Sequence, residues 1–226
     1  MAETASESSN KRIDGGIHAG AQAARRLSQG AHMNQPCPIT PAQRCGTIVR
    51  ALAQYRATVS ECYDEPLYEV IERVQESGSL GKVDIGALYL WKRIPRGKWG
   101  LKLLTMPEAQ VRDITAAAVQ RARHEDLPTP EAAAAARTVL SPLPGMRTGD
   151  ALPSALIVAA APDRMAVYNR RARKGLAEVC LPLSDGSGRY QRYIELVEQC
   201  RIELAEQGAE IQTAREIDLA LYWRGG

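Results

Sequence analysis

Apolar side chains recur at intervals of three and four residues along most of the chain, which is the spacing of one face of an α-helix. Ile48, Leu52 and Tyr55 form such a stripe and predict a helix over residues 42–58. The same spacing, interrupted by Pro and Gly, predicts further helices over about 65–77, 85–93, 107–124, 130–140, 151–161, 170–178, 189–207 and 213–223. Strand patterns are almost absent, and Met165 to Tyr168 is predicted to be an extended connector. The pattern therefore predicts an all-α fold.

Polar residues stand at three of the predicted helix starts. Asp64 precedes the helix that ends at Ser77, and Asp84 precedes the short helix that ends at Arg93. Thr129 is followed by Pro130, and a capping side chain before a first-turn proline is typical of a helix start. These side chains are expected to accept hydrogen bonds from the N–H groups of the first turn.

Composition divides the chain into two parts. Residues 1–36 are rich in Ala, Ser, Gly, Gln and charge and carry no apolar stripe, so a flexible tail is expected there. Residues 37–226 are long enough to bury a substantial core, and 45% of the chain is hydrophobic. No apolar run approaches the roughly 18–20 residues that span a bilayer, and the start lacks the apolar core of a secretory signal. The sequence predicts a cytoplasmic protein without a membrane partner.

Charge and cysteine spacing narrow the chemistry further. The formal net charge is only +3, but residues 164–176 hold five basic side chains and no acidic one. Such a run forms either a solvated helix face or a surface for nucleic acid. The five cysteines lack C-x-x-C spacing and the three histidines are dispersed, so neither a metal site nor a cofactor is predicted.

The segment from Leu143 to Arg173 contains the most specific pattern. It begins with Leu-Pro-Gly, continues into a helix of small and apolar residues, and places Asn169 fifteen positions after Ser154. This combination resembles the helix-hairpin-helix/Gly-Pro-Asp superfamily of base-excision DNA glycosylases over about residues 60–226. The resemblance implies a two-lobed helical fold with a cleft between the lobes, in a monomer associated with the nucleoid.

The resemblance also implies a set of functional residues on double-stranded DNA. The hairpin glycines and a nearby cation would contact a phosphate, and basic residues after Asn169 would lie along the strand. The DNA-binding residues so expected are Gly145, Arg147, Gly149, Arg170, Arg171 and Arg173. Tyr168, Trp91 and Trp223 are expected to line a pocket for a flipped base, although aromatic residues at helical spacing are also typical of a core.

Asn169 occupies the position of the family's catalytic aspartate. A carboxylate there stabilises the positive charge that develops on the sugar as the base departs, and a neutral amide lacks that charge. Three interpretations remain: an inactivated form of an enzyme, a variant that uses Asp218 or Asp150 instead, or a protein that binds DNA without cutting it. The stretch 148–154 has no lysine, so an active enzyme is expected to be monofunctional and to use water.

The leading hypothesis is thus a monofunctional DNA glycosylase, or an Asn-substituted form of one, that acts in base-excision repair of damaged DNA. A non-catalytic DNA-binding protein on the same scaffold is the alternative. A third interpretation is a small all-α interaction protein in which Leu-Pro-Gly is only a turn.

Overall fold

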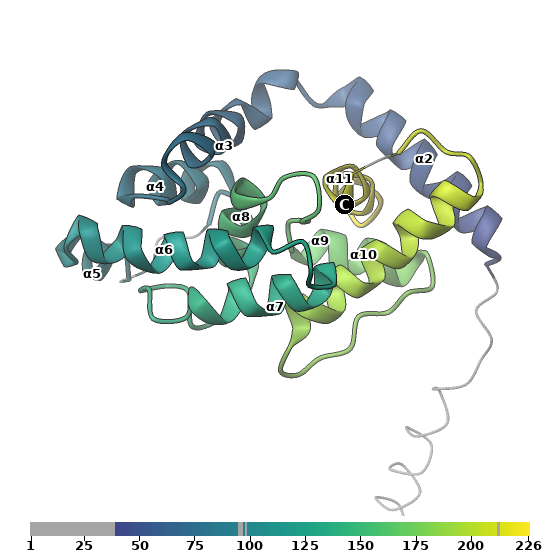
Figure 1. Cartoon of the computed structure of the whole chain (residues 1–226). Coiled ribbons are helices and arrows are strands. Elements are labelled where there is room, and N and C mark those ends of the chain that lie inside the picture. The colour runs from purple at the N-terminus through teal and green to yellow at the C-terminus, as the bar shows by residue number, and fades with distance from the viewer. Residues whose placement is uncertain (1–38, 95–96, 98, 212) are drawn as a thin grey trace, which may run out of the picture. The chain divides into compact units, whose positions relative to one another are not determined.

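The structure is a computed structural model that describes residues 39–94, 97, 99–211 and 213–226. In this part of the chain the regular structure consists of ten α-helices and one 3₁₀-helix, which confirms the predicted all-α fold (Figure 1). Residues 39–226 form one compact unit. The predicted tail over residues 1–36 lies outside the described residues.

The helices follow one another with short connections. The first half contains α2 (Pro41–Thr58), η1 (Glu61–Asp64), α3 (Glu65–Ser77), α4 (Lys82–Trp91), α5 (Trp99–Thr105) and α6 (Glu108–Arg123). The second half contains α7 (Thr129–Val139), α8 (Ala151–Ala160), α9 (Arg170–Glu178), α10 (Arg189–Glu206) and α11 (Ala214–Arg224). None of these helices is both long and apolar enough to cross a membrane.

The three predicted caps differ in detail from the observed ones. Asp84 is the third residue of α4 and accepts a hydrogen bond from the Gly81 N–H at 2.8 Å. Thr129 is the first residue of α7, because Pro128 occupies the cap position. Asp64 precedes α3 without capping it, since its carboxylate accepts from the Trp91 indole N–H at 2.9 Å instead. A tertiary partner thus takes the place of the predicted local one.

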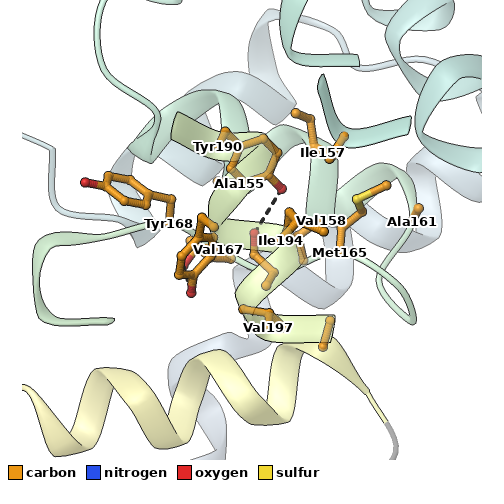
Figure 2. Close-up of a cluster of buried hydrophobic side chains, with 14 of the residues drawn as sticks. Ala155, Ile157, Val158, Ala161, Met165, Val167, Tyr168, Tyr190, Ile194 and Val197 are labelled. Carbon is orange, nitrogen blue, oxygen red and sulfur yellow. Dashed lines mark hydrogen bonds between the residues drawn. The ribbon is translucent and has the colours of Figure 1, made fainter. Parts of the chain in front are cut away.

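Helix α8 lies at the centre of the fold and contacts α3, α4, α6 and α7 (Figure 1). Its residues from Leu152 to Ala160 are all buried, which explains why the sequence is apolar on every side of this helix. Figure 2 shows side chains of α8 gathered with Ile194 and Val197 of α10 and with Met165 and Val167 of the connector. The core therefore joins the two halves of the sequence.

The connector from Met165 to Tyr168 is non-helical, as predicted, and its four residues are buried. Side chains satisfy its backbone groups, because buried N–H and C=O groups without partners would be costly. The Val167 N–H donates to Asp218 at 2.8 Å, and the Tyr168 N–H donates to Ser154 Oγ at 3.0 Å. The Tyr190 hydroxyl donates to the Ala166 carbonyl at 3.0 Å (Figure 2). These bonds fix the point at which α9 begins.

Helix α9 packs against α11 at a glycine. A Cβ atom at Gly175 would overlap the carbonyl oxygen of Leu221, so only glycine permits this approach of the two backbones. A Cβ atom at Gly225, directly after α11, would likewise overlap the carbonyl oxygen of Arg171. Two glycines therefore hold α9 at a defined distance from α11.

Gly175→Ala is expected to lower the free energy of unfolding by about 1–3 kcal/mol, because the new methyl group must push α9 away from α11. Gly86 offers a matched control: it lies on the exposed side of α4, and a Cβ added there would meet no atom within 4 Å. Gly86→Ala should stabilise the protein by up to about 1 kcal/mol through helix propensity. Urea unfolding followed by circular dichroism measures both, and equal effects would contradict the close contact at Gly175.

Candidate functional site

A cavity of about 1190 Å³ opens beside the N-terminus of α9. Its walls come from η1 and the end of α4, from the start of α8, from the end of the connector, and from α9, α10 and α11. The described lining residues are Tyr63, Lys92, Arg93, Ile94, Gly149, Asp150, Ala151, Tyr168, Asn169, Arg170, Arg171, Arg173, Lys174, Ala177, Arg189 and Tyr222. Segments that lie as far apart as residues 63 and 222 thus meet at one site.

The cavity is strongly basic. Its described walls contain two lysines and five arginines, whereas Asp150 is the one acidic residue among them. Asp150 is itself neutralised by two ion pairs, at 2.9 Å to Arg137 and at 2.8 Å to Arg189. Two more of these cations have acidic partners outside the lining, because Arg173 lies 2.9 Å from Asp185 and Lys174 lies 3.9 Å from Glu178. The positive charge that remains makes this site suited to an anionic ligand.

Helix α9 supplies much of this charge from an unusual position. Arg170 and Arg171 are exposed in its first turn, where the helix dipole disfavours cations and favours anions. Asn169 caps the helix, with its Oδ1 accepting from the Ala172 N–H at 2.8 Å. A helix N-terminus that also carries two cations offers both N–H groups and charge to a phosphate.

Three tyrosines line the cavity, and an arginine lies over each ring. The guanidinium carbon of Arg189 lies 5.0 Å from the centroid of the Tyr168 ring. The corresponding distance is 5.1 Å for Arg171 over Tyr222 and 5.9 Å for Arg93 over Tyr63. The Tyr168 ring also packs edge-on against Tyr193, with centroids 5.4 Å apart. A base could therefore stack on Tyr168 only where Arg189 gives way.

Arg93 has a backbone conformation that favours glycine. Its φ angle is +49°, in the left-handed region, and it follows the last turn of α4 where a glycine commonly stands. Holding a residue with a Cβ there costs about 1–2 kcal/mol. Backbone strain of this kind gathers at functional sites, and here it accompanies a guanidinium on the cavity wall.

Six of the residues predicted from sequence line this cavity: Gly149, Tyr168, Asn169, Arg170, Arg171 and Arg173. Gly145 and Arg147, the predicted DNA-binding residues at the start of the hairpin, do not line it. The Trp99 ring covers Gly145, so closely that a Cβ there would overlap it. Arg147 is exposed and borders a second, smaller cavity of about 330 Å³ between the 147–150 turn and the loop before α10.

Trp91, Trp223 and Asp218 lie away from the cavity wall. Trp91 is 5% exposed and is held by its bond to Asp64, so it belongs to the core. The Trp223 indole N–H donates to Gln54 at 3.2 Å. Asp218 is fully buried and bound by Arg215 at 2.8 Å, where it supports the connector. The structure therefore does not place the two tryptophans or Asp218 on the wall of this cavity, where the sequence-based prediction expected them.

Lys92, Arg93, Arg189 and Tyr63 line the cavity but were not among the site residues predicted from sequence. The available signal was the triplet Trp91-Lys92-Arg93, in which a buried aromatic residue directly precedes two cations. Spacing alone could not distinguish these cations from ordinary surface charges, because the elements that face them lie far from them in the sequence, from η1 before them to α8, α9, α10 and α11 after them.

Within residues 39–226 as far as they are described, no group of three or more His, Cys, Asp or Glu side chains is placed to hold a metal ion. No protein-family model, no curated protein and no solved structure matches this chain. The geometry and charge of the cavity are therefore the basis for assigning a function.

Proposed function

We propose that this protein binds duplex DNA over the α9 cavity and removes a damaged or modified base from a nucleotide flipped into it. The observation that carries the proposal is the convergence of seven basic side chains on one cavity that also contains Tyr168 and Asn169. The resemblance of residues 143–173 to the helix-hairpin-helix glycosylases supports the same function. The two lobes of that family would then correspond to the two sides of the cavity.

Each part of the cavity has a role in this proposal. Arg170 and Arg171, together with the N–H groups at the start of α9, bind backbone phosphates without reading sequence. The cavity exceeds the roughly 300–1,000 Å³ of most small-ligand sites, which leaves room for an extruded nucleotide. Tyr168 and Tyr222 offer aromatic faces to the base. Arg189 and Arg171, which lie over these rings, would move from them to the phosphates when the base stacks.

A non-catalytic DNA-binding protein is the second candidate, and Asn169 is the reason. Its Oδ1 is engaged as the cap of α9, and its side chain carries no negative charge. Asp150, the described carboxylate on the cavity wall, is held between Arg137 and Arg189. Either an amide dipole or a doubly paired carboxylate would have to stabilise the charge on the sugar.

Gel-shift titration of a labelled duplex at several salt concentrations tests the binding step. Replacing both Arg170 and Arg171 by Ala is expected to weaken binding to all duplex sequences alike by about tenfold or more. The slope of log K against log salt should fall by about 2, one for each lost phosphate contact.

Arg50 and Arg121 provide a control of equal charge, because both are exposed and neither lines the cavity. Their double replacement by Ala should leave the affinity close to that of the unchanged protein. Absence of duplex binding even at low salt would overturn the proposed function, and equal loss in both double variants would place the DNA elsewhere.

A further inference from the structure

The four most exposed large apolar side chains in the described part of the chain lie on two successive helices. Val83 and Leu90 of α4 are 79% and 74% exposed, and Leu101 and Leu104 of α5 are 72% and 66% exposed. None of the four lines the α9 cavity. Because monomeric proteins rarely expose such groups together, this apolar patch indicates a surface that another molecule covers.

Helix α3 lies along one side of α4 in the antiparallel direction. The Arg73 guanidinium of α3 donates to Asp84 near the start of α4 at 2.7 Å. The Tyr63 hydroxyl, directly before α3, donates to the carbonyl of Trp91 at the end of α4 at 3.4 Å. Both helices also contact α8, so their outer sides face away from the core together (Figure 1).

Helix α5 lies along the other side of α4 and is also antiparallel to it. The Lys82 amine at the start of α4 donates to the carbonyl of Leu104 near the end of α5 at 3.1 Å. At the opposite ends, the rings of Tyr89 and Trp99 pack edge-on with centroids 5.2 Å apart. Positions 82 and 89 point roughly 160° away from positions 84 and 91 around the α4 axis. The three helices therefore form a row with α4 in the middle.

The outer side of α4 is apolar along its whole length. Val83, Ala87 and Leu90 recur there at intervals of four and three residues, whereas Ile85 and Leu88 on the inner side are buried. The middle of the row thus offers water a continuous apolar stripe, which on a helix is typical of a face that packs against another element.

The two edges of the row carry opposite charge. Four exposed glutamates of α3 share one side of that helix at intervals of four, three and four residues: Glu65, Glu69, Glu72 and Glu76. Within the described part of the chain only the second of them forms an ion pair, at 3.3 Å to Arg73. The α5 edge carries Lys82 and the exposed Lys102, and Glu108 beside it is neutralised by Arg112 at 3.0 Å.

We propose that the row of α3, α4 and α5 is the contact surface of a dimer with a second copy of this chain. A two-fold axis parallel to α4 places the apolar stripe of each copy against that of the other. The same axis places α3 of each copy against α5 of its partner, so an acidic edge meets a basic edge on both sides. An axis across the row would instead place α3 against α3, and like charges would face one another. The resemblance to DNA glycosylases implied a monomer.

The register of the row determines which charges meet. Asp84 of α4 lies beside Arg73 of α3. The bond from residue 82 to residue 104 places Asp84 level with Lys102, because α4 and α5 are antiparallel. Glu72, which precedes Arg73, is therefore at the height of Lys102, and a two-fold axis along α4 preserves that height. Glu72 of each copy then faces the partner's Lys102.

The size of the surface fits a dimer that dissociates on dilution. Helix α3 has 13 residues and is about 20 Å long, and three neighbouring helices are about 30 Å wide. The row then covers roughly 600 Å² on each copy, which is at the lower end of the range of specific interfaces. A dissociation constant in the micromolar range is therefore expected.

Sedimentation equilibrium of the full chain tests the proposal. Between about 1 and 100 μM the mean mass should rise from the 24.6 kDa of one chain towards twice that value. Leu90→Glu adds a charge to the apolar stripe and should raise the dissociation constant at least about 100-fold. Ile202→Glu is the matched control, because Ile202 is 52% exposed on α10, outside the row, and the dimer should persist. Both positions are exposed, and circular dichroism checks that each variant is folded.

An exchange of charge tests the arrangement of the two copies. Glu72→Lys and Lys102→Glu each place like charges opposite one another, so each variant alone should dimerise about tenfold more weakly. An equimolar mixture of the two variants should regain the affinity of the unchanged protein, because the charges at positions 72 and 102 are then opposite at both contacts.

The outcomes decide the proposal without reference to DNA, which is absent from these experiments. A single-chain mass at every concentration overturns it, and so does a dimer that Leu90→Glu leaves intact. A dimer that Leu90→Glu breaks but that the mixture of charge variants does not restore overturns the two-fold arrangement along α4. Failure of duplex binding would leave all of these results unchanged.

Discussion

Replacement of Arg215 by Ala is expected to lower the free energy of unfolding by about 3–5 kcal/mol, the largest loss of stability predicted for this chain. The Arg215 guanidinium binds Asp64 at 2.9 Å and Asp218 at 2.8 Å, and the side chains of these two acids are 11% and 1% exposed. Removing the cation leaves two buried carboxylates without a counter-charge. Urea unfolding at neutral pH measures the effect.

The same network connects stability to the position of the site. Asp64 holds the Trp91 indole N–H, and Asp218 holds the backbone N–H of Val167 two residues before Asn169. Arg215 also lies over the Trp91 ring, 5.2 Å from its centroid. One guanidinium thus ties the end of α4 to the connector, and its loss should loosen both walls of the cavity.

The pH dependence distinguishes loss of charge from loss of packing. Burial raises the pKa of the Asp218 carboxyl, while Arg215 lowers it, so Arg215→Ala should raise this pKa further. Between its unfolded and folded pKa values the folded variant binds more protons than the unfolded chain, so its stability falls as pH rises through that window. The variant should therefore lose less stability at pH 4 than at pH 7.

Two further variants serve as controls. Arg201→Ala removes a guanidinium that is 41% exposed and paired with Glu198 at 2.8 Å on the same helix, and it should cost no more than about 1 kcal/mol. Adding Asp218→Asn to Arg215→Ala should recover part of the stability, because the amide oxygen can still accept from Val167. A loss that is independent of pH and unaffected by Asp218→Asn would show that packing alone is responsible.

Asn169→Asp is expected to raise the rate of base release from a duplex at least about 100-fold if the protein acts as a glycosylase. The substitution adds a negative charge on the cavity wall, where the departing base leaves positive charge on the sugar. An aspartate is as good a helix cap as asparagine, so the bond to the Ala172 N–H and the stability of α9 should both persist. The charge is then the main change.

Base release is measured on duplexes that each carry one modified base, with alkali to break the strand at abasic sites. Asn169→Ala is the control, since it removes both the cap and the polar group and should cost about 1 kcal/mol of stability without any gain in rate. If Asn169→Asp binds every duplex in the panel and releases no base, the non-catalytic candidate replaces the glycosylase.

Helices with a buried stripe were predictable from local pattern. The segment predicted over 170–178 and the observed α9 have the same bounds, because the basic run meets a capping Asn at one end and buried Ala172 and Leu176 on its inner side. Helix α5 was not predicted. It is seven residues long, which is too short for a repeated apolar stripe to reveal a helix, and Leu101 and Leu104 are 72% and 66% exposed.

The candidate site was predictable where its residues are neighbours in sequence. Tyr168, Asn169 and the arginines of α9 form one continuous segment, and the structure places them on one cavity. Trp91 and Lys92 are also adjacent in sequence, but one faces the core and the other the cavity. Which residue of such a pair turns inward depends on the helices that cover α4, and its own sequence contains no record of them.

The amino-acid sequence by itself determined the helical fold, the apolar helix α8 and the basic first turn of α9 after Asn169, because helix periodicity and capping depend on residues within a few positions of one another. Only the tertiary structure decided that Lys92 and Arg93 line the same cavity as the first turn of α9. It also decided that Arg215 binds two acids from distant segments and that Trp91 is buried. Those contacts arise where helices cross, and a crossing is set by the packing of side chains from the whole chain.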